Sequence, residues 1–349
     1  MKIKKAFVTG GTGFIGTRLV KQLIDNGTEV VCLVRKQSKT ETLVQLGCQL
    51  IYGDLQDRTL SLSGVQHCDV LFHVAATKNA ANPKDLLQTN PTATENLLEA
   101  VLRSSATPRI IGVSSLAACG PSVNGRPTIE TDSPSPVSYY GRSKLLCEQT
   151  LIAYADRLPI SIVRPPIVIG QGDANALRMF KLIQKFNCHL IPGSTDRQYS
   201  IIHVDDLVEA MIGVACQGQT IADAPAAAGI YFVSAEQLIY AELGQKIGLA
   251  LDRSRIRNLY VPRPIFWSIG ATNSLLAWAT NRPRFLNLDK YREASAGEWT
   301  CSAAKLFEET DVKAPVPLQT RLEQTVQWYQ QHGWLSSNAP NAFHTEPTA

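Results

Sequence analysis

A tyrosine and a lysine stand four positions apart in the segment Tyr140-Gly141-Arg142-Ser143-Lys144. A helix is expected from about Ser138 to Ala155, and it would put both side chains on one face, about one turn apart. A free tyrosine titrates at about pH 10, and an adjacent ammonium group lowers that pKa. The pair Tyr140 and Lys144 therefore predicts general acid–base catalysis at the phenol oxygen.

Two serines, Ser114 and Ser115, end an apolar run that predicts a strand from Ile110 to Ser114. A hydroxyl group at this place can form a hydrogen bond with the oxygen of a reacting carbonyl group. A tyrosine and a lysine at this spacing also occur by chance on helix surfaces. The motif gains weight because a complete nucleotide-binding pattern precedes it.

That pattern begins with a predicted strand from Lys5 to Thr9, a glycine-rich loop and a helix from Phe14 to Asn26. Glycines permit a tight turn and let backbone N–H groups approach a pyrophosphate, which the positive end of the helix dipole stabilises. The pattern therefore predicts a dinucleotide site. Its loop residues are Gly10, Gly11, Thr12, Gly13, Phe14, Ile15 and Gly16.

The second predicted strand, Glu29 to Val34, ends in a basic cluster that begins with Arg35 and Lys36. Sites that prefer NAD have Asp or Glu here, which binds the ribose 2′-hydroxyl. The Arg35 guanidinium can instead pair with a 2′-phosphate. We therefore predict NADP (NADPH) as the cofactor, with NAD less favoured. The alternative is that the cluster is only a solvated surface feature.

Nearly continuous apolar runs alternate with helical segments through the first half of the chain, which is typical of a parallel sheet buried on both faces. Further strands are expected at Gln49 to Tyr52, Val70 to Ala75 and Ile160 to Val163, and a helix at Pro91 to Arg103. We predict an α/β fold: a Rossmann doubly wound parallel sheet with a smaller C-terminal substrate-binding domain.

The expected division has an NADP-binding domain at 1–165, a mainly substrate-binding domain at 166–335 and a disordered tail at 336–349. Strands from about 200–235 are expected to return to the sheet, with Ile201 to Val204 and Ile230 to Val233 as the candidates.

The composition excludes several classes of protein. The net charge of +4 is scattered over 349 residues, so no basic stripe suits a nucleic acid. Eight scattered cysteines without metal-ligand spacing indicate reduced thiols and no metal site. The apolar run after Met1 to Lys5 is too short for a signal peptide, and no apolar stretch of about 18 residues occurs. A cytoplasmic protein is expected.

Together, these patterns make the chain similar to the extended short-chain dehydrogenases/reductases, the NAD(P)-dependent epimerase/dehydratase superfamily. In pattern it most resembles the 3β-hydroxysteroid dehydrogenase-like and dihydroflavonol reductase-like members. The resemblance covers about residues 3 to 335. Its motifs are the loop Thr9 to Gly16, Gly53-Asp54-Leu55, His73-Val74-Ala75-Ala76, Asn90 opening a helix, Ser114-Ser115, Tyr140-x-x-x-Lys144, Arg164-Pro165-Pro166 and His203-Val204-Asp205-Asp206-Leu207.

The resemblance implies roles for residues by position. Ser115, Tyr140 and Lys144 would form the catalytic triad, and the family's spacing to the lysine favours Tyr140 over Tyr139. For the cofactor, Asp54 and Leu55 would flank the adenine, Val74, Ala75 and Ala76 would line the ribose, and Pro165, Pro166, Ile167 and Val168 would border the nicotinamide. Asp206 is expected to cap a helix beginning at Leu207.

Two departures from the family pattern bear on the substrate. Many sugar-nucleotide members have an arginine that clamps the substrate diphosphate, where this chain has Tyr199; Arg197 is a candidate substitute. The segment 261–284 is aromatic and apolar, which leaves three interpretations: a lid over the substrate, a helix at a membrane surface, or core of the small domain.

The expected function is that of an NADP-dependent oxidoreductase acting on CH–OH groups, which interconverts a ketone and a secondary alcohol on a largely apolar, steroid-, terpenoid- or polycyclic-like substrate. Tyr140 would transfer the proton, Lys144 would bind the ribose and Ser115 would hold the oxygen. The alternatives are a sugar-nucleotide epimerase or dehydratase with tightly bound NAD(P), and a non-catalytic NADP-binding scaffold or sensor. Expected partners are the small-molecule substrate, a membrane surface at 261–284 and a second copy in a homodimer.

Overall fold

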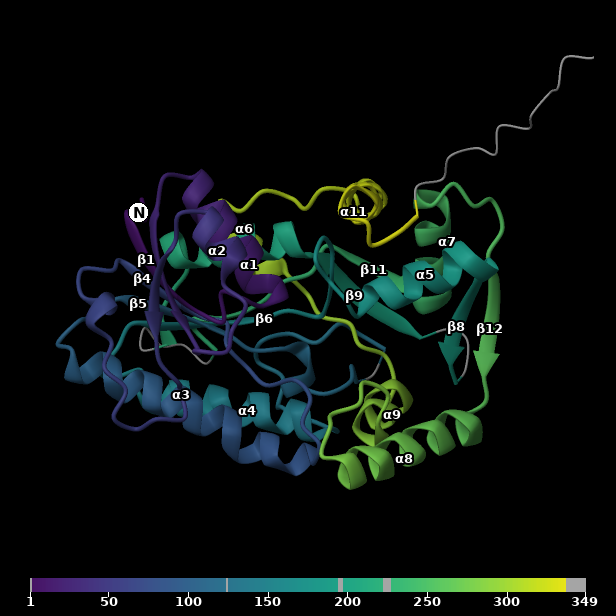
Figure 1. Ribbon diagram of the computed structural model, residues 1–349, viewed down its shortest axis with the longest axis horizontal. Coiled ribbons are helices and arrows are strands. Elements are labelled where there is room, and N and C mark those ends of the chain that lie inside the picture. The colour runs from purple at the N-terminus through teal and green to yellow at the C-terminus, as the bar shows by residue number, and fades with distance from the viewer. Residues whose placement is uncertain (1, 124, 194–196, 222–226, 337–349) are drawn as a thin grey trace, which may run out of the picture.

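The computed structural model describes residues 2–123, 125–193, 197–221 and 227–336. Its centre is a seven-stranded parallel sheet (Figure 1). In spatial order the strands are β3 (Gln49–Tyr52), β2 (Glu29–Val34), β1 (Lys5–Thr9), β4 (Val70–His73), β5 (Arg109–Val113), β6 (Ile160–Arg164) and β10 (Ile230–Phe232). The prediction of a doubly wound parallel sheet is confirmed.

Helices cover both faces of this sheet because its strands are apolar on both sides. One face packs on α1 (Phe14–Asp25) and α6 (Val204–Gln217), through residues such as Leu19 and Met211. The other packs on α3 (Leu86–Arg103) and α4 (Tyr139–Ala153), through residues such as Leu97 and Leu151. The chain changes direction between β1 and β4, and in such sheets ligands bind at the carboxyl ends of the strands beside that point.

A smaller body lies beside the carboxyl ends of the main strands (Figure 1). It contains a three-stranded sheet in the order β11-β9-β7 and a two-stranded sheet of β12 and β8. Its elements are β7 (Ile167–Ile169), α5 (Ala176–Phe186), β8 (Cys188–Pro192), β9 (Gln198–His203), β11 (Glu236–Ile239), α7 (Tyr240–Ala250), β12 (Arg257–Val261), α8 (Arg263–Thr280), α9 (Leu288–Ser295) and α11 (Leu318–Gln331). Helix α10 (Ala304–Glu309) packs on β10 of the main sheet and on α6. The remaining elements are α2 (Glu41–Gln45) and the 3-10 turns η1 (Ser63–Val65), η2 (Pro83–Asp85) and η3 (Leu116–Ala118).

The two strands expected to return to the main sheet have different outcomes. β10 does join it, parallel to β6. The expectation for Ile201 to Val204 is wrong, because β9 pairs with β7 and β11. An apolar run shows that a strand is buried, but it does not say which neighbour the strand pairs with. Of the expected tail, residues 337–349 lie outside the described residues.

The start of α3 also differs from its prediction. The helix begins at Leu86 rather than at Pro91, so Asn90 lies inside it. Proline at the first helical position needs no hydrogen-bond partner, which is why the sequence favours a start at Pro91. The earlier turn forms nevertheless, because Leu86 and Asn90 are buried there, and their packing outweighs the hydrogen bond that proline cannot donate.

A buried ion pair joins α4 to β6. The Arg164 guanidinium donates to both carboxylate oxygens of Glu148, over 2.9 and 2.7 Å. The side chains are 4% and 1% exposed, and the guanidinium also lies over the Phe232 ring, 5.3 Å from its centroid. The pair fixes the position of the helix that begins with Tyr139 and Tyr140.

Candidate active site

One cavity of about 1120 Å³ runs from the glycine-rich loop to the smaller body. A single-ligand pocket is typically about 300–1,000 Å³, so this volume suits a dinucleotide and a second molecule together. Most residues that the sequence predicts for the site line it: Gly10, Thr12, Gly13, Phe14, Ile15, Gly16, Arg35, Asp54, Leu55, Val74, Ala75, Ala76, Ser115, Tyr140, Pro166, Ile167 and Val168.

The glycine-rich loop forms a cradle for phosphate. Gly10 has a φ of +75° and lies so close to the next loop that a Cβ there would be 2.6 Å from the Ala75 nitrogen. A Cβ on Gly16 would overlap the Gly10 carbonyl oxygen. The first turn of α1 has no acidic residue and no side-chain cap. Its free N–H groups therefore fit the pyrophosphate of a dinucleotide.

The end of β2 carries an exposed arginine into the same cavity. Arg35 follows Val34 directly, and it lines the cavity together with Ser38 and with Asp54 after β3. This is where the adenosine ribose of a dinucleotide binds in doubly wound folds. The position fits a guanidinium that would bind a 2′-phosphate.

Three predicted residues, Gly11, Lys144 and Pro165, lie just behind the cavity wall. A Cβ on Gly11 would be 2.7 Å from Cys32 Sγ. Pro165 is buried, and its carbonyl oxygen accepts a hydrogen bond from the Leu116 nitrogen, which supports the turn that follows Ser115.

Tyr140 and Ser115 meet where α4 approaches η3. A hydrogen bond from Ser115 lowers the pKa of Tyr140, but burial and the charge of Glu293 raise it more, so the pKa of the phenol is raised overall. The close approach depends on Gly141, because a Cβ there would overlap the Ala117 carbonyl oxygen.

Lys144 is buried below this pair, and its Nζ donates to the Val113 carbonyl oxygen over 2.6 Å. Burial lowers its pKa. The sequence predicts that Lys144 lowers the pKa of Tyr140, whereas the structure gives Tyr140 a raised pKa, because the phenol is buried beside a carboxylate. The phenol is therefore protonated at neutral pH.

Two acidic residues of α9 hold the first turn of α4. The Asp289 carboxylate accepts hydrogen bonds from the backbone nitrogens of Tyr139 and Tyr140, over 2.8 and 3.1 Å. Glu293 accepts a hydrogen bond from Ser138 Oγ over 2.7 Å and pairs with Lys290. Lys290 Nζ lies 5.9 Å from the centroid of the Tyr140 ring. The sequence does not predict these contacts, because no residue near Tyr140 in the chain points to α9.

Buried polar side chains fix the loop that follows β4. Asn90 accepts from the Thr77 nitrogen over 2.8 Å and donates to Ser143 Oγ over 3.1 Å, so it ties this loop to α4. His73 bonds Thr9 through Nδ1 and Thr94 through Nε2. Burial, helped by the charge of Lys144, lowers the pKa of His73 to about 3. This imidazole is neutral and has a structural role.

The far end of the cavity is apolar and aromatic. Its lining includes Met179, Leu182, Leu190, Pro192, Tyr199, Tyr240, Leu243, Phe285, Leu286 and Trp299. Tyr199 packs on Tyr240 with ring centroids 5.3 Å apart. Arg197 donates to the carbonyl oxygens of Ala294 and Ser295 at the end of α9, so its guanidinium is engaged there. A different arginine, Arg178, lines the cavity over the Phe285 ring.

The motif at His203 has a structural role at the start of α6. His203 Nδ1 accepts from the Asp205 nitrogen and caps the helix. The expectation that Asp206 is the cap is wrong: α6 begins at Val204, and Asp206 pairs with Arg321 of α11. Within the described ranges, no three His, Cys, Asp or Glu side chains gather as metal ligands would.

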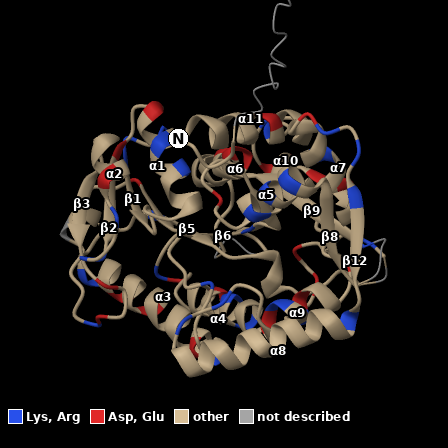
Figure 2. Cartoon of the chain, turned by 45° about the vertical axis from the view of Figure 1, so that its right-hand side comes forward, with Lys and Arg blue, Asp and Glu red and all other residues tan. Residues whose placement is uncertain are grey.

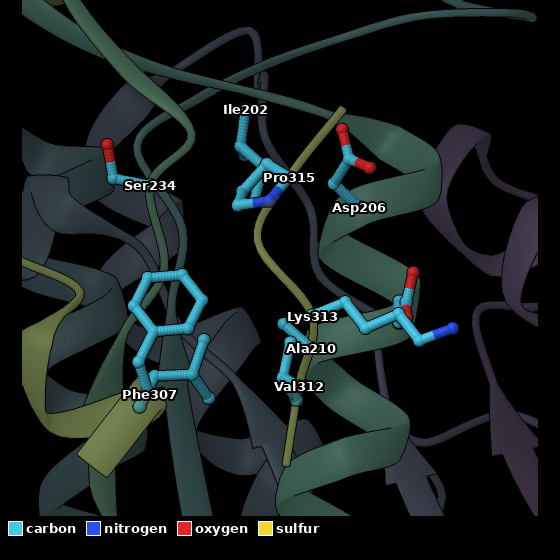
Figure 3. A pocket seen from close by; sticks show the side chains of 10 residues that line it. Ile202, Asp206, Ala210, Ser234, Phe307, Val312, Lys313 and Pro315 are labelled. Carbon is cyan, nitrogen blue, oxygen red and sulfur yellow. The ribbon is translucent and has the colours of Figure 1, made fainter. Parts of the chain in front are cut away.

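A second pocket lies beside Asp206, between α6 and the segment that contains Val312 and Pro315 (Figure 3). Its volume is about 10 Å³. A cavity needs about that much to hold one water molecule, so this pocket does not suit a substrate.

The model of the NAD dependent epimerase/dehydratase family matches residues 6–224. The ceramide reductase of Caulobacter vibrioides is 28% identical, over 95% of this chain and 96% of its own. The decarboxylating sterol-4-alpha-carboxylate 3-dehydrogenase of Dictyostelium discoideum is 29% identical, over 58% of this chain and 64% of its own.

The solved structure of a UDP-glucose 4-epimerase from Thermotoga maritima has a similar fold. It superposes with a TM-score of 0.73 at 21% identity, over 94% of this chain and 99% of that one.

Proposed function

Because the chain belongs to the NAD dependent epimerase/dehydratase family, and is thus an NAD(P)-dependent oxidoreductase acting on CH–OH groups, we propose that it reduces the ketone of a largely apolar substrate with NADPH. The observation that carries the proposal is the cavity of about 1120 Å³, in which a phosphate cradle and an aromatic chamber flank Tyr140.

The proposed binding of NADP uses the loop Gly10 to Gly16, with Arg35 on the 2′-phosphate, Asp54 and Leu55 at the adenine, Val74 to Ala76 at the ribose and Pro165 to Val168 at the nicotinamide. The cofactor supplies the hydride. Lys144 would hold the ribose hydroxyls, and Ser115 would donate a hydrogen bond to the substrate carbonyl oxygen.

Tyr140 donates the proton to the oxygen that becomes the alcohol. A phenol whose pKa lies above its ordinary value of about 10 is protonated at neutral pH, so it carries the proton that reduction of a ketone needs. Asp289 holds the N-terminal turn that carries the phenol.

The apolar chamber supports a steroid-, terpenoid- or lipid-like substrate, and one relative is named a ceramide reductase. Burying roughly 300 Å² of apolar surface at about 25 cal/mol per Å² stabilises the complex by about 7 kcal/mol before ordering costs. The test is NADPH oxidation across a series of ketones of increasing apolar size. We expect kcat/KM to rise with size and to change little with salt, and a preference for small polar ketones would contradict the proposal.

Arg35→Ala tests the choice of cofactor. We expect NADPH binding to weaken by about 1.5 to 3 kcal/mol, because a charged hydrogen bond to the 2′-phosphate is lost. Binding of NADH should hardly change, and it is the internal control in the same titration. An equal loss for both cofactors, or a preference of the unaltered protein for NADH, would show that Arg35 does not select NADP.

Glu293→Gln tests the electrostatic control of the phenol. Because the Glu293 carboxylate raises the pKa of Tyr140, its neutral replacement should lower that pKa. Alcohol oxidation needs the phenolate, so its rate should rise at lower pH than in the unaltered protein. The measurement is kcat for oxidation against pH, with Glu308→Gln on the exposed side of α10 as the control. If the pH dependence of kcat did not change in Glu293→Gln, Glu293 would not control the pKa of Tyr140.

A sugar-nucleotide epimerase or dehydratase is the second candidate, and Arg178 in the cavity is the observation that favours it. A guanidinium there can pair with a diphosphate. Tight, salt-sensitive binding of UDP-glucose that is lost in Arg178→Ala or Arg197→Ala, with no net oxidation of NADPH, would support this candidate over the reductase.

Three further expectations stay proposals. We propose that the NADP-binding domain ends at residue 165 and that the mainly substrate-binding domain follows it. A cytoplasmic location rests on cysteines that are all free thiols, and a homodimer would form through α3 and α4, where Leu146 and Ile152 are exposed.

A further inference from the structure

Helix α8 lies along one edge of the molecule and covers little of it (Figures 1 and 2). It begins after Pro262 and ends at Asn281, whose φ of +47° closes the helix. Of its eighteen residues, Gly270 and Ala277 are buried, and they lie two turns apart on the face toward α9. The interpretation of this segment as core is therefore wrong for most of its apolar side chains.

Those side chains are large and exposed. They are Ile265, Trp267, Ile269, Leu275, Leu276 and Trp278, and Trp278 is 75% exposed. Figure 2 shows the helix without charge along its length and with a basic residue at its end near β12. An exposed apolar face of this size marks an interaction site.

The charges around the helix have one sign. Between Arg253 and Leu288 the chain has no acidic residue, and its arginines flank the helix on both sides. Arg255, Arg257, Arg263, Arg282 and Arg284 are exposed. Tryptophan is enriched where proteins meet the bilayer interface, and arginines are attracted to anionic headgroups, so an apolar helix flanked by exposed arginines fits an anionic lipid surface.

We propose that α8 docks the protein on an anionic lipid surface, with its apolar side chains among the acyl chains and its flanking arginines at the headgroups. The helix would lie on the membrane without crossing it, since no helix among the described residues is long and apolar enough to cross a membrane. After α8, Phe285 and Leu286 lead directly into the lining of the cavity. Docking thus brings the apolar end of the cavity to the lipid. This inference rests on the proposed function, because an apolar ketone would enter the cavity from the lipid.

The test is co-sedimentation of the full chain with vesicles of phosphatidylcholine alone and of phosphatidylcholine with phosphatidylglycerol. We expect at least tenfold tighter binding to the anionic vesicles, and weaker binding as salt rises. Each arginine at the surface contributes roughly fivefold, so Arg282→Glu with Arg284→Glu should abolish the preference. Trp278→Glu should weaken binding to both vesicles.

Leu249→Glu on α7 is the matched control, because Leu249 is exposed and apolar but lies outside this face; it should bind as the unaltered protein does. Binding is measured without turnover, so a wrong substrate class leaves this result intact. Equal binding to neutral and anionic vesicles, or none to either, would overturn the proposal. So would self-association that Trp278→Glu abolishes, since the helix would then cover a second copy of the chain.

Discussion

Replacing Tyr140 by phenylalanine is expected to lower kcat by about 10²- to 10⁴-fold, the usual contribution of a positioned general acid. The substitution removes one hydroxyl group and leaves the ring that packs between α4 and the cavity. Folding and NADPH binding should therefore stay close to those of the unaltered protein. Steady-state kinetics, together with cofactor titration by fluorescence, would separate the two effects.

Tyr139→Phe is the matched control, since that phenol is adjacent in sequence and its ring lies near Arg142 and Arg292. It should keep most of the activity. The opposite result, with Tyr139→Phe inactive and Tyr140→Phe active, would mean that the wrong tyrosine has been assigned.

Glu148→Ala is expected to lower the free energy of unfolding by about 3–5 kcal/mol, because it leaves the Arg164 guanidinium buried without its partner. The measurement is urea denaturation followed by circular dichroism. If the alanine variant does not fold, Glu148→Gln keeps an acceptor for the guanidinium and should show a smaller loss.

The control for this prediction is Lys21→Ala, which breaks the exposed ion pair with Asp25 on α1. Exposed pairs of this spacing contribute only about 0.3–0.5 kcal/mol. Equal losses in the two variants would show that the buried pair contributes no more than an exposed one.

The sequence predicts well those parts of this protein whose structure depends on residues that are close together in the chain. The strand, loop and helix around Gly10 to Gly16 follow from residues that are neighbours in the chain, and the sheet follows from continuous apolar runs. The motifs that resemble the extended short-chain dehydrogenases/reductases lie in such segments, and the family match confirms that resemblance.

The parts that the sequence does not predict depend on contacts between distant segments. Asp289 reaches the Tyr140 nitrogen from 149 residues away, and no periodicity near either residue points to the other. The pairing of β9 with β11 depends in the same way on a neighbour later in the chain. Asn90 is a related case: its motif is visible, but its bonds to Thr77 and Ser143 need the folded arrangement.

The contact of α9 with α4 has a thermodynamic consequence. Glu293 contributes to the raised pKa of the phenol, and α9 also supplies Lys290 and Ala294 to the wall of the cavity. A ligand that displaces α9 alters the proton affinity of Tyr140, and by reciprocity the protonation of Tyr140 alters the affinity for that ligand. The same coupling free energy then determines both the affinity for the ligand and the pKa of Tyr140. Calorimetry would detect it as proton uptake or release when the ligand binds.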